Sequence, residues 1–413
     1  MINEYMIMRF LRVRTLPDRC HRCGFCTSVN ICYSAGVGYC TGCLSCYWAC
    51  PYEAKVIEEV EEERKLIRIE VDGVEVQVPE GITVLRALEL LGYRVTVFPE
   101  RGEKVVNAPC RTGSCWACAV VINGELERSC ITPVREGMKV STDVKGKEPL
   151  RVVHGPQPHP VGGKGTPWWE KRKGRYIEVA IWVGGCNLRC PQCQNYFVTY
   201  DNTSTPMTPK EAARLVTYYR RKYGVNGLAI SGGEPTINRK WLVEYFRELR
   251  RLNPDKKARL HLDSNGTVLT PDYIDELVEA GCNNIGVEPK ALYVDTYMRI
   301  TGIADRELAE KYLQTAWNAV KYIIDHYRDR VYLGVGFVYN SALISREEIV
   351  KMGEKLASWD PEVQVCVLDY FPAFRRRDLV RPPPSEMLEI KKLLNDVGLK
   401  YVIVQTSIGH FGP

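Results

Sequence analysis

The sequence lacks a long apolar run and has little excess charge. Its 413 residues contain no stretch of about 18 apolar side chains, the length that a membrane-spanning helix needs. Residues 1–13 lack the long apolar core and the small-residue cleavage site of a secretory signal peptide. The net charge of +6 is mild and forms no basic stripe, so nucleic-acid binding is unsupported. We therefore expect a cytoplasmic protein that has no membrane partner.

Cysteine is too scarce for a disulfide scaffold, but it is unevenly placed. The chain has 17 cysteines, about 4% of its residues, whereas disulfide-rich proteins exceed about 8–10%. Eight of them lie between residues 20 and 50. In a reducing cytosol, clustered cysteines bind metal more often than they form disulfides. The chain is long enough for two to four domains.

The first eight cysteines form two runs with the spacing of iron–sulfur ligands. A proline follows the second run, as in bacterial ferredoxins, where three cysteines bind one 4Fe-4S cluster and the fourth binds its neighbour. By this logic Cys50 joins the first run and Cys32 the second, although the assignment of these fourth ligands is open. Zinc is the less favoured alternative. The predicted ligands are Cys20, Cys23, Cys26, Cys32, Cys40, Cys43, Cys46 and Cys50.

A third set of cysteines has the plant-type 2Fe-2S spacing, with gaps of four, two and eleven residues. Upstream, residues 65–78 alternate apolar and polar side chains around Asp72-Gly73, which predicts a β-hairpin. Residues 83–91 then show helical periodicity. This order predicts a β-grasp ferredoxin domain with the ligands Cys110, Cys115, Cys118 and Cys130.

The region of this third set resembles known electron-carrying domains. Residues 65–140 resemble the 2Fe-2S domains of succinate dehydrogenase iron–sulfur subunits. The string at 130–138 is similar to those of NADH dehydrogenase and formate dehydrogenase. The resemblance implies that this domain conducts electrons.

A fourth set contains only three cysteines, Cys186, Cys190 and Cys193. Three thiolates cannot complete the ligation of a 4Fe-4S cluster, so one iron stays open for an outside ligand, as a catalytic metal site requires. An iron with an open coordination position indicates that this cluster takes part in a catalysed reaction. The remaining Cys282 and Cys366 lie in apolar segments, and we expect them to be buried side chains.

Strands and helices alternate after residues 154–166, a segment rich in proline and glycine that we interpret as a linker. The alternation predicts a parallel sheet, and six to seven units fit an α/β fold with a partial TIM-type (βα)6 barrel. The predicted strands are 176–183, 227–230, 259–262, 284–287, 331–338 and 363–368, and the predicted helices are 209–222, 239–251, 271–279, 307–326, 346–357 and 384–396.

Unusual strings stand at the carboxyl ends of four predicted strands, where such barrels carry their chemistry. Gly184-Gly185-Cys186 follows the first strand and Ser231–Pro235 the second. Asp263–Gly266 and Glu288-Pro289-Lys290 follow the third and the fourth. We therefore expect these four strings to lie together at one end of the barrel.

These strings resemble the radical SAM superfamily over about residues 173–408, and the three-cysteine motif and Gly232–Pro235 are its most specific marks. Asp263–Gly266 and Thr301-Gly302 are similar to the pyruvate formate-lyase activating enzymes and to the AmmeMemoRadiSam-system group. One departure is Gln192, at a position that is usually aromatic. Another is Glu288-Pro289-Lys290, which replaces the usual Asp-x-Lys.

The resemblance implies an anaerobic oxidoreductase that cleaves S-adenosylmethionine (SAM) reductively. The open iron would bind the amine and carboxylate of SAM, and one electron would break a carbon–sulfur bond to give a 5′-deoxyadenosyl radical that abstracts hydrogen. Gly232, Gly233 and Glu234 would accept the amine protons. Asn265 and Lys290 would contact the ribose or the carboxylate.

We expect the N-terminal clusters to relay electrons from an external low-potential donor to the Cys186 site, with the 2Fe-2S domain as the entry port. The substrate is either a glycine on a partner protein, as in activating enzymes, or a small molecule or cofactor precursor. The alternative is an electron-transfer subunit that assembles into a larger oxidoreductase, with a non-catalytic barrel.

We divide the chain into four parts. They are a ferredoxin-like 4Fe-4S module (1–62), a 2Fe-2S β-grasp domain (63–146), the linker (147–172) and the radical SAM barrel (173–413). Residues 58–64 are expected to form an exposed helix or link, and Arg375–Arg377 a solvated charge run.

The cysteine assignment predicts the iron content. Three 4Fe-4S clusters and one 2Fe-2S cluster would give about 14 iron atoms per chain. Iron and sulfide analysis of anaerobically reconstituted, gel-filtered protein measures this number. Four or fewer iron atoms would contradict the assignment.

Overall fold

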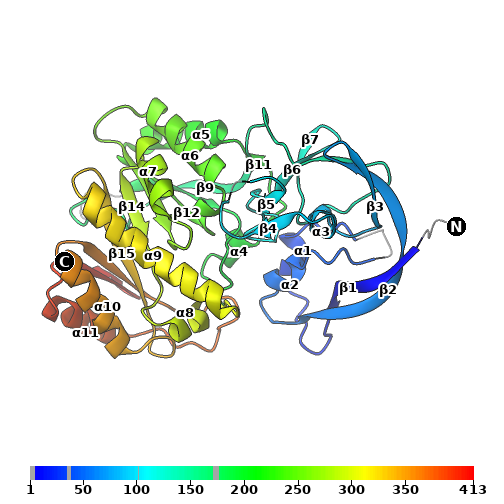
Figure 1. Ribbon diagram of the computed structural model, residues 1–413. Coiled ribbons are helices and arrows are strands. Elements are labelled where there is room, and N and C mark those ends of the chain that lie inside the picture. Colours follow the sequence, from blue (N-terminus) through cyan, green and yellow to red (C-terminus); the bar gives the residue numbers. More distant parts are fainter. Residues whose placement is uncertain (1–4, 35–38, 101, 171–175) are drawn as a thin grey trace. The chain divides into compact units, whose positions relative to one another are not determined.

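The computed structural model describes residues 5–34, 39–100, 102–170 and 176–413. The chain forms two compact units, and each contains segments that are distant in sequence (Figure 1). The first unit comprises Met1–Val152, Gly184–Asn187 and Tyr196–Pro206, and the second comprises Val153–Val183, Leu188–Asn195 and Met207–Pro413. None of the described helices is long and apolar enough to cross a bilayer.

Strand β2 (Lys55–Val71) organises the first unit and pairs antiparallel with β1 (Tyr5–Thr15). The expectation of a helix or link at residues 58–64 is wrong, because this segment lies inside β2. Its acidic side chains face arginines across the strand pair, as where Arg12 donates to Glu58 at 3.0 Å. The boundary drawn after residue 62 therefore cuts through a continuous strand.

The predicted hairpin and helix of the 2Fe-2S domain are confirmed. Strands β2 and β3 (Val74–Pro79) turn at Asp72-Gly73, where both residues have positive φ angles of 48° and 83°. Helix α3 (Val84–Leu90) begins at Thr83, whose side chain caps it. The other elements of the unit are α1 (Phe25–Ser28), α2 (Ser45–Ala49), β4 (Arg94–Thr96), β5 (Val105–Asn107), β6 (Ala119–Ile122), β7 (Glu125–Arg128), β8 (Lys139–Ser141) and α4 (Tyr196–Thr199).

The second unit contains a sheet with the order β11-β9-β10-β12-β13-β14-β15-β16-β17-β18, in which β10 through β17 run parallel. The partial barrel is confirmed. The strands are β9 (Arg151–His159), β10 (Glu178–Val183), β11 (Pro206–Met207), β12 (Gly227–Gly232), β13 (Arg259–Ser264), β14 (Asn284–Val287), β15 (Tyr332–Tyr339), β16 (Gln364–Asp369), β17 (Val402–Thr406) and β18 (Gly409–Phe411).

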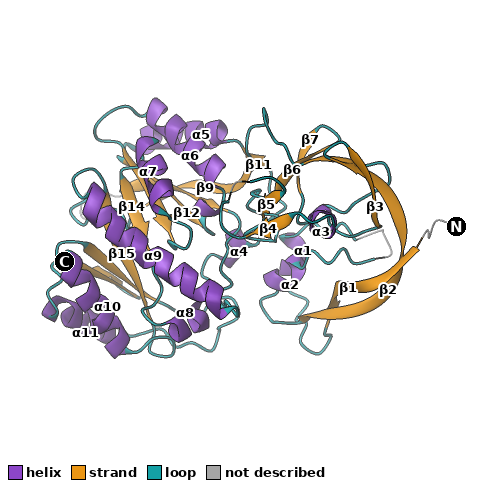
Figure 2. Ribbon diagram, in the orientation of Figure 1, coloured by secondary structure: helices purple, strands orange, loops and turns teal. Residues whose placement is uncertain are grey.

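All six helices expected between the strands are present, with ends within two residues of the prediction (Figure 2). The helices α5, α6, α9 and α11 pack against strands that they connect. Pattern analysis missed α8, because it is short. The helices are α5 (Pro209–Tyr223), α6 (Arg239–Leu252), α7 (Pro271–Glu279), α8 (Val294–Thr301), α9 (Arg306–Tyr327), α10 (Arg346–Trp359) and α11 (Pro384–Asp396), and a short 3-10 turn is η1 (Pro235–Ile237).

The segment interpreted as a linker belongs to the barrel, so that interpretation is wrong. Strand β9 pairs antiparallel with β10 from His159 to Val153. The chain then enters the interior, where Gln364 donates to the carbonyl of Lys164 at 2.8 Å. A Cβ on Gly334 would lie 1.8 Å from that carbonyl oxygen. Bare glycine backbone in β15 therefore makes room for the segment. The boundary predicted at residue 173 lies outside the described residues.

Replacing Gly334 by Ala should destabilise the barrel, because the strand or the inner segment would have to shift. We expect the free energy of unfolding to fall by about 3 kcal/mol, at the upper end of overpacking costs. Chemical denaturation of the full chain measures the loss.

Gly224→Ala is the matched control. Its Cβ would meet no atom within 4 Å, so the only strain comes from its positive φ of 63°. We expect this strain to lower the free energy of unfolding by about 1 kcal/mol. Equal losses in the two variants would show that the inner segment does not press on β15.

Candidate functional site

The three-cysteine loop follows β10, and its second half is fixed by backbone hydrogen bonds within the barrel unit. The amide of Arg189 donates to the carbonyl of Thr301 at 2.8 Å. The amides of Arg375 and Arg376 donate to the carbonyl of Pro191, at 2.9 and 3.2 Å. The run Arg375–Arg377 was expected to be only a solvated charged segment. Its backbone also anchors the three-cysteine loop. The side chain of Arg376 pairs with Asp378 at 2.8 Å.

Two amide side chains add further anchors to this loop. The side chain of Gln192 is buried and donates to the carbonyl of Ile300 at 2.6 Å, so this departure from the usual aromatic residue has its own structural use. Asn195, which sequence reasoning missed, donates to the carbonyl of Gly232 at 3.3 Å. Its only signal in the sequence is its place two residues after Cys193.

The Gly232–Glu234 string closes tightly on the end of β10. A Cβ on Gly232 would lie 2.3 Å from the amide nitrogen of Val183, and its φ is 121°, so only glycine fits. The amide of Gly233 donates to the carbonyl of Val183 at 2.8 Å. The buried carboxylate of Glu234 accepts hydrogen bonds from the Ser264 hydroxyl at 2.8 Å and the Asn265 amide at 2.7 Å. This carboxylate therefore joins the ends of β12 and β13.

The side chain of Asn265 also has local partners. Its Oδ1 accepts from the amide of Thr267 at 3.0 Å and from the hydroxyl of the same residue at 2.7 Å. The contacts of Glu234 and Asn265 with SAM remain predictions. Because the Glu234 carboxylate and Asn265 Oδ1 already have partners in the protein, backbone groups or the side-chain nitrogen of Asn265 would have to make these contacts.

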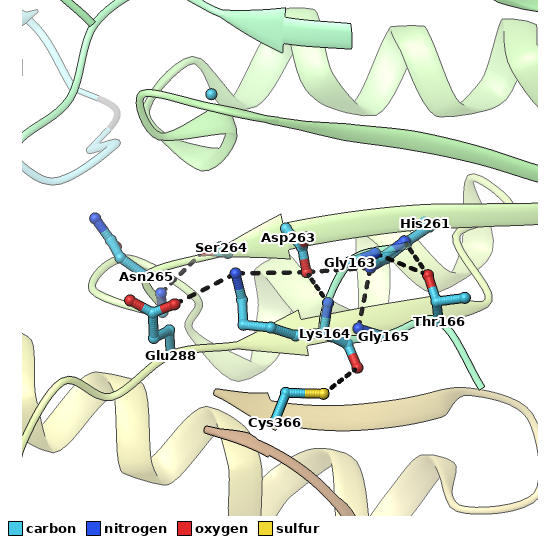
Figure 3. Close-up of polar contacts among 12 residues, drawn as sticks. Gly163, Lys164, Gly165, Thr166, His261, Asp263, Ser264, Asn265, Glu288 and Cys366 are labelled. Atoms are coloured by element: carbon cyan, nitrogen blue, oxygen red, sulfur yellow. Dashed lines mark hydrogen bonds and ion pairs between the residues drawn. The ribbon is translucent and has the colours of Figure 1, made fainter. Parts of the chain in front are cut away.

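A group of buried charges lies inside the barrel at the ends of β13 and β14 (Figure 3). The Nζ atom of Lys164 lies 3.6 Å from Asp263 Oδ1 and 3.4 Å from Glu288 Oε2. Lys290 donates to Glu288 and, at 2.8 Å, to the hydroxyl of Tyr370. Burial would raise the pKa of Glu288, but the two lysines lower it to about 2. The group is therefore a set of ion pairs.

Lys164 is the residue of this group that sequence reasoning missed. The only signal was a single lysine between glycines, in the string Gly162-Gly163-Lys164-Gly165. A glycine-rich string is also typical of a flexible linker. Only the contacts of Lys164 with the ends of the neighbouring strands β13 and β14 reveal its place.

A second ion-paired set lies deeper in the barrel. His261 Nδ1 lies 3.3 Å from Glu178 Oε2, and its Nε2 lies 3.1 Å from Asp263 Oδ1. Burial would lower the pKa of His261, but the two carboxylates raise it to about 9. His261 is thus a packed, ion-paired strand residue.

The four cysteines of the third set form a closed group of sulfur ligands. All four are buried. The thiol of Cys110 lies close enough to that of Cys115, and the thiol of Cys118 to that of Cys130, for each pair to interact. Four converging thiols shielded from water fit a 2Fe-2S cluster, whose ligands are thiolates.

The ferredoxin-like cysteines also fall into neighbouring groups. Burial raises the pKa of Cys26; Lys55 opposes this, and the nearby thiols of Cys50, Cys23 and Cys20 add to the rise. Cys50 is therefore close enough to the first run to act on it, in agreement with the exchange of fourth ligands.

In the second run, burial raises the pKa of Cys46 to about 12, and Cys43 and Cys40 contribute. Among the residues that the structure describes, no three Cys, His, Asp or Glu side chains are arranged to hold a single metal ion.

Two family models match the chain. Residues 181–341 match the radical SAM superfamily, and residues 64–145 match the 2Fe-2S iron-sulfur cluster binding domain. The chain therefore contains a radical SAM domain and a 2Fe-2S ferredoxin-like domain, as predicted.

Curated relatives match about a third of the chain. The probable GTP 3′,8-cyclase of Methanococcus aeolicus is 34% identical over 134 residues, which are 32% of this chain and 43% of that protein. The GTP 3′,8-cyclase of Rhodopseudomonas palustris is 32% identical over 137 residues, 32% of this chain and 39% of that protein. The matched segments thus span less than half the length of these relatives.

Among solved structures, the chain matches in part that of Streptococcus suis SuiB bound to S-adenosylmethionine. It has a TM-score of 0.40 and 14% identity, and the match covers 51% of this chain and 45% of SuiB. The resemblance to activating enzymes stays a prediction, because the named relatives carry another activity.

The ion pairs of His261 predict how stability depends on pH. A folded pKa of about 9 exceeds the ordinary value of about 6.5, so this stabilisation is complete below pH 6.5 and is lost as pH rises through 9. Between pH 6.5 and 9.5, the free energy of unfolding should fall by about 2 kcal/mol less in His261→Gln than in the unmodified chain. Thermal unfolding across this pH range measures the difference.

His326→Gln, at the exposed end of α9, is the control and should keep the slope of the unmodified chain. Parallel slopes for His261→Gln and the unmodified chain would mean that the imidazolium is not stabilised by Glu178 and Asp263.

Proposed function

We propose that the chain is a radical SAM enzyme that acts on a small molecule and receives electrons through its own N-terminal iron–sulfur domains. The observation that carries the proposal is the three-cysteine loop, which is anchored at Arg189, Pro191 and Gln192 beside the Gly232–Glu234 turn. A loop fixed in this way holds its thiols at defined positions, as cluster ligation requires.

The residues of the loop fit the cluster that the superfamily uses. When bound, a 4Fe-4S cluster with an open iron supplies the electron that cleaves SAM to a 5′-deoxyadenosyl radical. Cys186, Cys190 and Cys193 would hold it. Burial raises the pKa of Cys190 to about 11 and Lys290 lowers it, so that lysine favours the thiolate that metal ligation needs.

The backbone around the loop offers hydrogen-bond acceptors to SAM. The carbonyls of Gly232 and Gly233 are candidate acceptors for the methionine amine. Asn195 donates to the Gly232 carbonyl and so orients it. Lys290 and Tyr370 share a hydrogen bond of 2.8 Å and are the candidates for contacts with carboxylate or ribose oxygens.

Two observations favour a small, polar substrate over a protein glycine. Curated relatives that match about a third of the chain are named GTP 3′,8-cyclases, so a purine nucleotide is the first candidate. The charged side chains of Lys164, Asp263, Glu288 and Lys290 lie together inside the barrel and keep 8–14% of their area exposed. Such a set can bind several polar groups of one compact molecule.

The test is product formation by the full chain under anaerobic conditions. Reconstituted protein, dithionite and SAM should give 5′-deoxyadenosine, and GTP should raise its yield several-fold while being consumed. Cys190→Ala should abolish the product and remove about four iron atoms. Cys282→Ala, a buried cysteine outside the four sets, should leave both unchanged.

Each outcome bears on one part of the proposal. Absence of 5′-deoxyadenosine from fully loaded protein would overturn the enzyme assignment and favour the electron-transfer subunit. Product that forms at the same rate with and without GTP would overturn the purine nucleotide as substrate.

A further inference from the structure

The first unit, taken by itself, contains the start of the three-cysteine loop. Gly184–Asn187 belong to the same compact unit as the 2Fe-2S domain. A Cβ on Gly185 would lie 2.6 Å from the Cβ of Cys115 and 2.9 Å from its amide nitrogen. Cys115 is a predicted 2Fe-2S ligand, and Cys186 is the residue after Gly185. The two ligand loops therefore touch backbone to backbone.

A buried arginine fixes this contact from one side. Arg151 has no exposed area, and its guanidinium donates to the carbonyl of Gly184 at 3.0 Å. The same guanidinium acts electrostatically on the thiol of Cys115. The amide of Gly184 donates to the carbonyl of Val152, also at 3.0 Å. One side chain thus interacts with both loops.

The chain that leaves the three-cysteine loop is tied to the same unit. Asn202 is buried, and its side chain donates to the carbonyl of Thr112, in the 2Fe-2S loop, at 2.8 Å. It also accepts from the amide of Ile31, beside Cys32, at 2.8 Å. Arg128 donates to the carbonyl of Asn202 at 2.8 Å. Both ends of the three-cysteine loop are therefore attached to the cluster-bearing unit.

We propose that the contact between Cys115 and Gly185 is the last electron-transfer step to the Cys186 site, which makes the 2Fe-2S domain the immediate donor. The inference rests on the proposed function and names its internal electron donor. It reverses the order expected from the sequence, in which this domain was the entry port. Electron transfer slows steeply with distance, so loops in van der Waals contact are favoured over any longer route.

The step moves one electron and no atoms. A 2Fe-2S cluster held by Cys115 and its three partner cysteines would give up one electron, and a cluster held by Cys186, Cys190 and Cys193 would accept it. No bond forms or breaks, and no proton moves. An external one-electron donor of low potential reduces the N-terminal domains beforehand.

Gly185 is a positioning residue, and Gly185→Ala tests its role. The new Cβ would separate the loops. Gly137→Ala, in the same domain, is the matched control, because its φ of 73° is close to the 81° of Gly185 but its Cβ would meet no atom within 4 Å. Both variants carry similar backbone strain, and only one disturbs the contact.

The first readout is electron paramagnetic resonance of dithionite-reduced, full-length protein. In the unmodified chain, the reduced 2Fe-2S signal should relax at least several-fold faster than in Cys190→Ala, which lacks the neighbouring spin. This comparison does not depend on the folding of a glycine variant. Equal relaxation in the two proteins would overturn the inference.

The second readout is the rate at which the 2Fe-2S absorbance recovers after reduced, desalted protein is mixed with SAM. We expect Gly185→Ala to slow this recovery at least tenfold and Gly137→Ala to leave it unchanged. Equal rates in all three proteins would also overturn the inference. If 5′-deoxyadenosine still forms with dithionite in that case, the proposed function stands; if none forms, the proposed function fails instead.

Discussion

Close backbone approach at glycine is the constraint on which this structure depends. Gly185 lets the backbone pass against Cys115, Gly232 closes on the end of β10, and Gly334 leaves space for the carbonyl of Lys164. In each case a Cβ would lie within 2.6 Å of a neighbouring atom. Cluster-binding loops and a filled barrel need such approaches, because thiolates and charged groups must be held at short, fixed distances.

The buried charges of the barrel follow from that constraint. Once the glycines admit the inner segment, Lys164 reaches carboxylates at the ends of two strands and adds a second cationic partner to each of these buried groups, whose burial is costly when they are poorly paired. Glu288 lies between Lys164 and Lys290, and Asp263 lies between Lys164 and His261. The positive and negative groups alternate, so the interior stays polar and ordered. Such an interior offers directional contacts to a polar substrate.

Much of the fold could be predicted, because alternating apolar patterns and helix caps are local. The six strands and six helices expected after the linker are all present, and Pro271–Glu279 has the predicted ends. Two errors have physical causes. Residues 58–64 look helical because they are acidic, but arginines on β1 neutralise them in a strand. Residues 154–166 look flexible because of their glycines, but glycine also permits tight packing inside a barrel.

The sequence by itself determined the spacing of the cysteines, from which the types of cluster site are predicted, since ligand spacing lies within short loops. It also marked the mouth of the barrel through motifs at strand ends. Only the tertiary structure decided that Lys164 enters the barrel, that Asn195 orients the Gly232 carbonyl, and that the Cys115 loop touches Gly185. These contacts join residues far apart in the chain, and a local pattern carries no information about which distant backbone will fill the space beside a glycine.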